Sequence, residues 1–135
     1  MKYSIYIYME ENIYDIYATS EKNRIYMKLK GFFRDEQVKE AADKFLSELE
    51  KLQPNFDIIN DISEFRPATQ SGAQIIKETQ IKVAKKGIKR LVRVVDKRVM
   101  GLLQFKTNSK EAGYDGISVN SLDEAIKYLE SNQDS

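Results

Sequence analysis

The stretch Asp57-Ile-Ile-Asn-Asp-Ile-Ser-Glu-Phe-Arg-Pro-Ala-Thr-Gln-Ser-Gly72 contains a strand signal, a loop signal and a helix-start signal in succession. The apolar residues Ile58, Ile59 and Ile62 are typical of a buried strand, and the polar residues beside them indicate where that strand ends. A loop with a proline follows, and residues 69–72, with two hydroxyl groups, suit the N-terminus of a helix. In α/β folds, ligands and partners are met at the edge of the sheet where such a strand passes into its loop.

Strand and helix patterns continue from this stretch in both directions. Alternating apolar residues predict strands over 3–9, 13–19 and 24–30, and the turn-like residues between them favour an antiparallel meander. Apolar residues spaced by three and four predict helices over 35–52 and 71–86. The remaining predicted elements are buried strands at 56–62 and 88–95, a helical segment from Asp96 to Leu103, a short strand at 117–119 and a last helix behind the capping box of Ser121 and Glu124.

The order of these elements predicts the fold class. Strands that alternate with helices indicate a single α/β domain over residues 1–130, a sandwich whose sheet is mixed and mostly parallel. Its N-terminal strands are antiparallel, and about four helices pack on the sheet. Residues 131–135 are polar and predict a frayed tail.

The composition bounds the chemistry that the chain can perform. Its 135 residues carry a formal net charge of +1 and include neither histidine nor cysteine. Any reaction must therefore use carboxylates, lysines, hydroxyls or a bound cofactor. No carboxylate motif converges in the sequence, so we expect a protein that is not an enzyme, with no catalytic residue, no metal and no cofactor.

Charge and hydropathy also bound the location and the partners. The near-neutral charge argues against binding to nucleic acid, and no apolar run approaches the roughly 20 residues of a membrane span. The N-terminal segment meets Glu10 and Glu11 too early for a signal peptide, so we expect a cytoplasmic protein. Six of the eight tyrosines fall in residues 3–26. They favour the outer face of a sheet, with a homodimer or ligand surface on these strands as the alternative.

Three segments give the chain a resemblance to a known family. Asp61-Ile62-Ser63 resembles the strand end of the STAS domain, the fold of bacterial anti-sigma factor antagonists, and residues 69–72 stand where that family has Asp-Ser-Ser-Gly. Ala112-Gly113-Tyr114, followed by residues 117–125, resembles its closing strand and last helix. The resemblance covers roughly residues 24–130 and points to the STAS/SEC14-like group of bacterial proteins.

The resemblance implies a regulatory module that binds a protein partner, with a kinase-type regulator as the kind of partner expected. The phosphate-accepting serine of the family is replaced here by Gln70, so a switch at that residue is not expected; Thr69 or Ser71 are the alternatives. We expect the partner to bind the loop 63–72 and the start of the following helix. The predicted contact residues are Asp61, Ser63, Arg66, Thr69, Gln70, Ser71 and Gly72.

The alternative hypothesis is a SEC14-like carrier or sensor of a small apolar ligand. Its pocket would lie between the sheet and the helices, lined by residues such as Phe65, Ile75 and Leu103. An enclosed cavity would distinguish it from a docking module, whose core should be filled.

Overall fold

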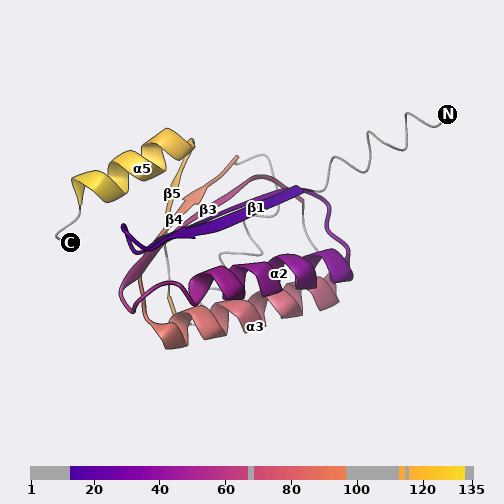
Figure 1. Cartoon of the computed structure of the whole chain (residues 1–135). Coiled ribbons are helices and arrows are strands. Elements are labelled where there is room, and N and C mark those ends of the chain that lie inside the picture. The colour runs from indigo at the N-terminus through magenta and orange to yellow at the C-terminus, as the bar shows by residue number, and fades with distance from the viewer. Residues whose placement is uncertain (1–12, 67–68, 97–112, 115, 133–135) are drawn as a thin grey trace.

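The computed structural model describes residues 13–66, 69–96, 113–114 and 116–132. The strands are β1 (Ile13–Thr19), β2 (Arg24–Gly31), β3 (Phe56–Phe65), β4 (Ile88–Val94) and β5 (Ile117–Val119). The helices are α2 (Asp35–Leu49), α3 (Gln70–Lys86) and α5 (Leu122–Ser131). Their order along the chain is visible in Figure 1.

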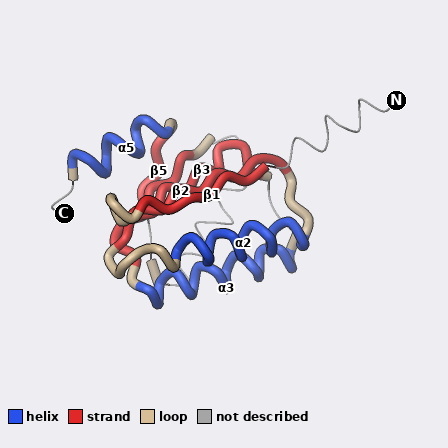
Figure 2. Tube along the Cα trace, viewed as in Figure 1, coloured by secondary structure: helices blue, strands red, loops and turns tan. Residues whose placement is uncertain are grey.

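The five strands form one sheet in the order β1-β2-β3-β4-β5. β1 pairs with β2 antiparallel, and each later pair is parallel, which confirms the predicted mixed and mostly parallel α/β sheet. Helices α2 and α3 lie side by side on one face of the sheet, and α5 lies on the other (Figures 1 and 2). Three helices are described where about four were expected, because residues 97–103 of the helical segment expected after Asp96 lie outside the described residues. The strand expected at 3–9 lies outside them as well.

Local sequence explains how the helices begin and end. Thr69 caps α3, because its Oγ1 accepts a hydrogen bond from the Gly72 N–H at 3.1 Å. Gly87 ends α3 in the left-handed conformation with φ of 105°, where a glycine avoids the strain of a Cβ. The expected cap of the last helix is also present, since Ser121 Oγ accepts from the Glu124 N–H at 3.2 Å. α5 extends through Ser131, the first residue of the expected tail.

Strand β3 is longer than its sequence pattern indicates. Its pairing with β2 shifts register between Lys28 and Lys30, so an extra residue of β3 is accommodated in a bulge. Without this bulge, strict alternation from Ile62 would place Phe65 on the α5 side of the sheet. With it, Phe65 is fully buried beneath α2 and α3, among the core residues that include Ile62.

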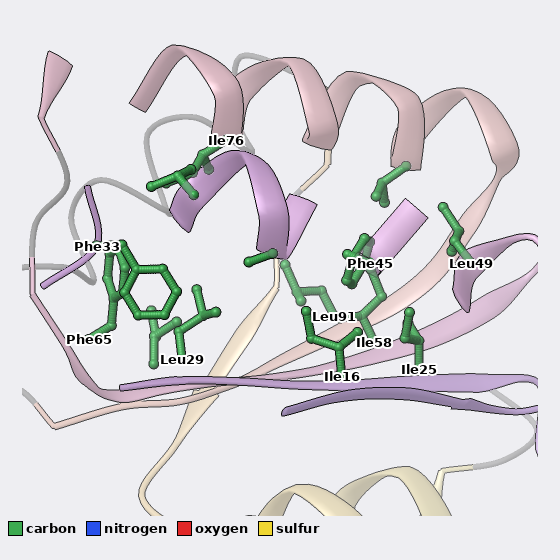
Figure 3. Close-up of a cluster of buried hydrophobic side chains, with 14 of the residues drawn as sticks. Ile16, Ile25, Leu29, Phe33, Phe45, Leu49, Ile58, Phe65, Ile76 and Leu91 are labelled. Carbon is green, nitrogen blue, oxygen red and sulfur yellow. The ribbon is translucent and has the colours of Figure 1, made fainter. Parts of the chain in front are cut away.

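The hydrophobic core has two parts, one on each face of the sheet. The larger part fills the layer between the sheet and the α2–α3 pair, where Figure 3 shows Phe45 and Leu49 of α2 above Ile25 and Ile58 of the strands. The smaller part lies under α5 and is formed by Ile59, Val92, Val94, Ala125 and Leu129. Among the helices of the described ranges, none is both long and apolar enough to cross a membrane.

Glu48 of α2 secures the outer edge of the sheet. Its carboxylate accepts the Ala18 N–H of strand β1 at 2.9 Å and also binds Lys51 at 2.8 Å and Lys44 at 3.4 Å. These contacts, led by the Lys51 hydrogen bond, lower the pKa of Glu48 to about 2. A backbone N–H that faces away from the β2 ladder is thereby satisfied, which protects an exposed strand edge.

Candidate functional site

The end of strand β3 holds the first two predicted contact residues. Asp61 is buried, and its Oδ1 accepts hydrogen bonds from the Ser63 backbone N–H at 3.1 Å and from the Ser63 hydroxyl at 2.6 Å. Both residues belong to β3, so they are strand residues and the loop begins after Phe65. The expectation that the strand ends in a polar corner at residues 60–63 was therefore wrong, because the bulge lets the pairing with β2 continue past them.

The start of helix α3 forms a separate polar cluster with the start of α2. The hydroxyls of Thr69 and Ser71 both donate to the carboxylate of Asp35, the first residue of α2, the Thr69 bond measuring 2.5 Å. The pKa of Asp35 is lowered most by the hydrogen bond from Ser71 and next by the hydrogen bond from Thr69. One carboxylate thus serves two helix N-termini, where a negative charge is favoured by the helix dipoles.

The structure divides the predicted partner site between the two faces of the sheet. Asp61 alternates with Asn60 and Ile62, and since Ile62 faces α2 and α3, Asp61 faces the α5 side. Thr69 and Ser71 lie on the other side, against Asp35. In the rest of the predicted set, Arg66 and Gln70 are exposed and Gly72 is buried.

A cavity of about 70 Å³ lies between the sheet and the α2–α3 pair. Four of its lining residues, Phe33, Phe45, Phe65 and Leu91, are among the core side chains labelled in Figure 3. Most of its wall is apolar. The polar residues among those described in the wall are Asn60, Thr79, Gln80, Arg93 and Tyr114.

Two side-chain amides in this wall are buried with an unsatisfied oxygen. Asn60 of β3 is 4% exposed and Gln80 of α3 is 7% exposed. Within the described part of the chain, neither Asn60 Oδ1 nor Gln80 Oε1 has a hydrogen-bond partner. The hydroxyl of Thr79 differs, because it donates to the Ile75 carbonyl within the same helix at 2.9 Å. Burying an unpaired polar atom destabilises a protein, so the two amides need an explanation.

Arg93 brings a positive charge to the same wall. It lies directly opposite Asn60 in the parallel pair β3–β4, and its side chain is fully buried. Neighbouring strands are about 4.8 Å apart, so these two side chains stand next to each other on the face that α2 and α3 cover. None of the described residues that line the cavity is acidic.

Tyr114 also lines the cavity and adds a phenol group to its polar residues. Burial raises the pKa of its phenol, and the nearby charge of Arg93 acts in the opposite direction. The phenol is therefore neutral at physiological pH and is both a donor and an acceptor of hydrogen bonds. The cavity thus combines apolar surface with amide, guanidinium and phenol groups.

Sequence patterns did not lead us to this site, although they contain a signal for it. Asn60, Gln80 and Arg93 each occupy a position whose neighbours at helix or strand spacing are apolar and buried. Asn60 lies between Ile58 and Ile62, and Gln80 follows Ile76 on α3. A polar residue at a core position in three neighbouring elements indicates a shared polar site.

The lining predicted for an apolar carrier is found in part. Phe65 lines the cavity as expected. On α3, Ile76 lines it and Ile75 does not appear among the described lining residues, because the apolar stripe of the helix passes through Ile76 and Val83. Leu103 lies outside the described residues.

A polar groove of about 420 Å³ lies at the amino-terminal edge of the parallel strands, and most of its charged residues form ion pairs with one another. Arg90 binds Asp57 through Nη2 at 2.7 Å and Nε at 2.9 Å. Glu130 of α5 binds Lys22 at 2.7 Å and Arg24 at 3.1 Å. These contacts tie α5 to the starts of the strands. Within the residues described, no group of three carboxylates is placed to hold a metal ion.

The tyrosine-rich strands are described only from β1 onward. Tyr17 and Tyr26 contact each other across β1 and β2, with ring centroids 5.1 Å apart and ring planes tilted by 39°, and Tyr17 is 46% exposed. Burial raises the pKa of Tyr26 to about 12. A homodimer through these strands stays a prediction.

No protein family model and no curated protein matches this sequence.

Proposed function

We propose that the chain is a non-enzymatic binding module of the STAS/SEC14-like kind that takes a small molecule into the cavity between its sheet and the α2–α3 pair. The observation that carries this proposal is the pair of buried amides, Asn60 and Gln80, whose oxygens have no partner among the described residues. Because an unpaired buried amide is costly, a ligand that satisfies both oxygens would explain why the fold keeps them. Sequence patterns favoured the docking module, and the cavity is the reason to place ligand binding first.

The chemistry of the wall supports binding rather than turnover. Side-chain amides do not titrate, and a guanidinium keeps its proton at any physiological pH. The phenol of Tyr114, with its raised pKa, is a poor general base. The cavity therefore offers recognition by hydrogen bonds and apolar contact, and we propose no reaction for it.

The volume of the cavity limits the size of the ligand. A dry cavity of about 150 Å³ holds a benzene ring, so about 70 Å³ suits a group of only a few non-hydrogen atoms. A long acyl chain does not fit this space. The ligand is therefore a small molecule, or the small end of a larger one.

A cavity-filling variant tests this function. Ala42 of α2 lines the cavity and is half-buried, so Ala42→Leu should occupy part of the space. Ala84 of α3 is also half-buried and is not among the described lining residues, which makes Ala84→Leu the matched control. Wild type and both variants are titrated with a panel of small organic molecules and followed by ¹H–¹⁵N NMR.

Saturable shifts at cavity residues in wild type and in Ala84→Leu, lost in Ala42→Leu, would support the proposal. If no compound of the panel shifts these residues, and native mass spectrometry finds no bound molecule on protein from the native host, the cavity is not a ligand site.

The docking module remains the second candidate, because one feature of the structure favours it. The exposed residue Gln70 lies between Thr69 and Ser71, whose hydroxyls both bind Asp35 where two helix N-termini meet. A surface fixed in this way suits recognition by a protein partner, of which a kinase-type regulator is the kind expected.

Photo-crosslinking tests the docking surface. A crosslinking amino acid at Gln70 should capture one defined partner in the native host, and the same amino acid at the exposed Lys82 on α3 should not. Ser71→Asp would place a second negative charge against Asp35 and should reduce capture, whereas Ser71→Ala should reduce it less. Equal capture from both positions would remove this surface from consideration.

A further inference from the structure

We infer that the cavity recognises a small carboxamide-type group, which donates hydrogen bonds to the buried amide oxygens and accepts one from Arg93. This inference rests on the proposed ligand-binding function of the same cavity and adds the chemical class of the ligand. It depends on three side chains from three neighbouring elements: Asn60 on β3, Arg93 on β4 and Gln80 on α3.

The unsatisfied amide oxygens indicate which hydrogen-bond donors the ligand must carry. Asn60 Oδ1 and Gln80 Oε1 are acceptors, so the group that satisfies them must carry N–H or O–H donors. An amide oxygen and nitrogen exchange places when the side chain turns over, so either residue can also present its NH₂ group. A ligand that both donates and accepts hydrogen bonds fits both orientations, and a purely apolar ligand fits neither.

Arg93 indicates which hydrogen-bond acceptor the ligand carries. A guanidinium has five donors and no acceptor, so beside Asn60 it favours an oxygen acceptor on the ligand. A carbonyl oxygen with an adjacent N–H places an acceptor and a donor side by side, as a carboxamide does. The apolar walls, including Phe33, Phe45 and Phe65, leave room for a short apolar substituent.

The size of a carboxamide also agrees with the cavity. Acetamide has four non-hydrogen atoms, and a cavity of about 70 Å³ holds a group of that order. Ordered water is the competing occupant, since two or more polar partners in a cavity this large are enough to hold it. The experiment must therefore distinguish a bound carboxamide from water.

Three planar probes of the same shape separate the contributions of the hydrogen bonds. Acetamide has a donor and an acceptor, acetone keeps only the acceptor, and isobutene has neither. Each is titrated into the full chain, and chemical shifts of the cavity residues give the Kd. We expect acetamide to bind in the millimolar range and about tenfold or more tightly than acetone, with isobutene weaker still.

Variants assign the preference to the amides. Gln80→Met keeps the length of the side chain and removes the amide, and it should abolish the preference for acetamide over acetone. Gln74→Met is the matched control, because Gln74 lies on the same helix but is exposed and donates to Glu78 at 3.3 Å. It should leave the preference unchanged, and Asn60→Leu provides a second test should Gln80→Met fold poorly.

Each other outcome counts against the inference in a distinct way. If the three probes bind equally, or if Gln80→Met and Asn60→Leu both keep the preference, the cavity binds small molecules but does not recognise a carboxamide. If acetamide fails while another small molecule binds, the ligand class is wrong and the proposed function stands. A crystal structure that shows only ordered water at saturating acetamide, together with no binding from the wider panel, removes the inference and the proposed function alike.

Discussion

The variant Gln80→Met should stabilise the free protein. Gln80 is 7% exposed, and its Oε1 has no hydrogen-bond partner within the described residues. Methionine has nearly the same length and a similar helix propensity, so the exchange mainly replaces the buried amide by an apolar group. The gain in the free energy of unfolding should therefore measure how much the buried, unsatisfied amide destabilises the wild-type protein.

The magnitude follows from the burial of that oxygen. An unsatisfied buried acceptor costs about 1–3 kcal/mol. We expect the free energy of unfolding to rise by about 1–2 kcal/mol, which raises the Tm by roughly 3–8 °C for a domain of this size. The cavity of about 70 Å³ stays nearly the same, so it contributes little to the difference.

The assay is unfolding by guanidinium chloride followed by circular dichroism, with no other small molecule present. Urea is avoided because its carbonyl and NH₂ groups match the ligand class inferred for the cavity. Gln74→Met on the same helix is the control. Gln74 is exposed and its one described contact, with Glu78, is worth only about 0.2–0.5 kcal/mol, so its loss should lower the stability slightly or not at all. An unchanged m-value in all three proteins would show that the difference lies in the native state.

A loss of more than about 1 kcal/mol in Gln80→Met would refute the reasoning, because it would show that the amide is satisfied in the native protein. The same conclusion would follow if the two variants had equal stability. In either case the structural basis of the ligand hypothesis would be gone.

Three further predictions test the scaffold. Stability should fall as the pH drops from about 4.5 to about 2, because the Glu48 carboxylate, whose pKa is about 2 in the folded protein, stabilises the fold only while it is ionised. In urea melts at a series of pH values, Glu48→Gln should lose less stability over this range than wild type. An equal loss in both proteins would assign the acid sensitivity to other carboxylates. Gly116→Ala should lower the Tm markedly, since an added Cβ would lie 2.6 Å from a backbone carbonyl oxygen of β4; a Tm within about 1 °C of wild type would mean that β5 moves freely. Leu49→Ala should cost about 2–5 kcal/mol and Leu46→Ala clearly less, because Leu49 is 3% exposed while Leu46 is only partly buried, and equal losses in denaturant melts would contradict this assignment of the α2 face.

Much of the fold could be predicted because its signals are local. The spacing of apolar residues along 35–52 and 71–86 indicates helices, since side chains three and four residues apart share one face. The caps at Thr69, Gly87 and Ser121 are equally local, as each depends on hydrogen bonds or dihedral angles within a few residues. The order of the elements then favours the mixed, mostly parallel sheet that the structure has.

The candidate site depended on contacts that no local pattern contains. The β3 bulge arises from pairing with β2, and it alone turns Phe65 towards α2 and α3. Alternation along β3 places Asp61 on the opposite face from Thr69 and Ser71, so residues that are close in the sequence do not form one surface.

The cavity is the feature that could least be predicted from the sequence. The sequence shows three polar residues at core positions, Asn60, Gln80 and Arg93. Gln80 follows Asn60 by 20 positions, and Arg93 follows Gln80 by 13. Whether their side chains satisfy one another or leave a space is decided by the volumes of the side chains that β3, β4, α2 and α3 bring together. Packing is a property of the whole layer, and so the tertiary structure alone determined that a space remains and that two amide oxygens face it.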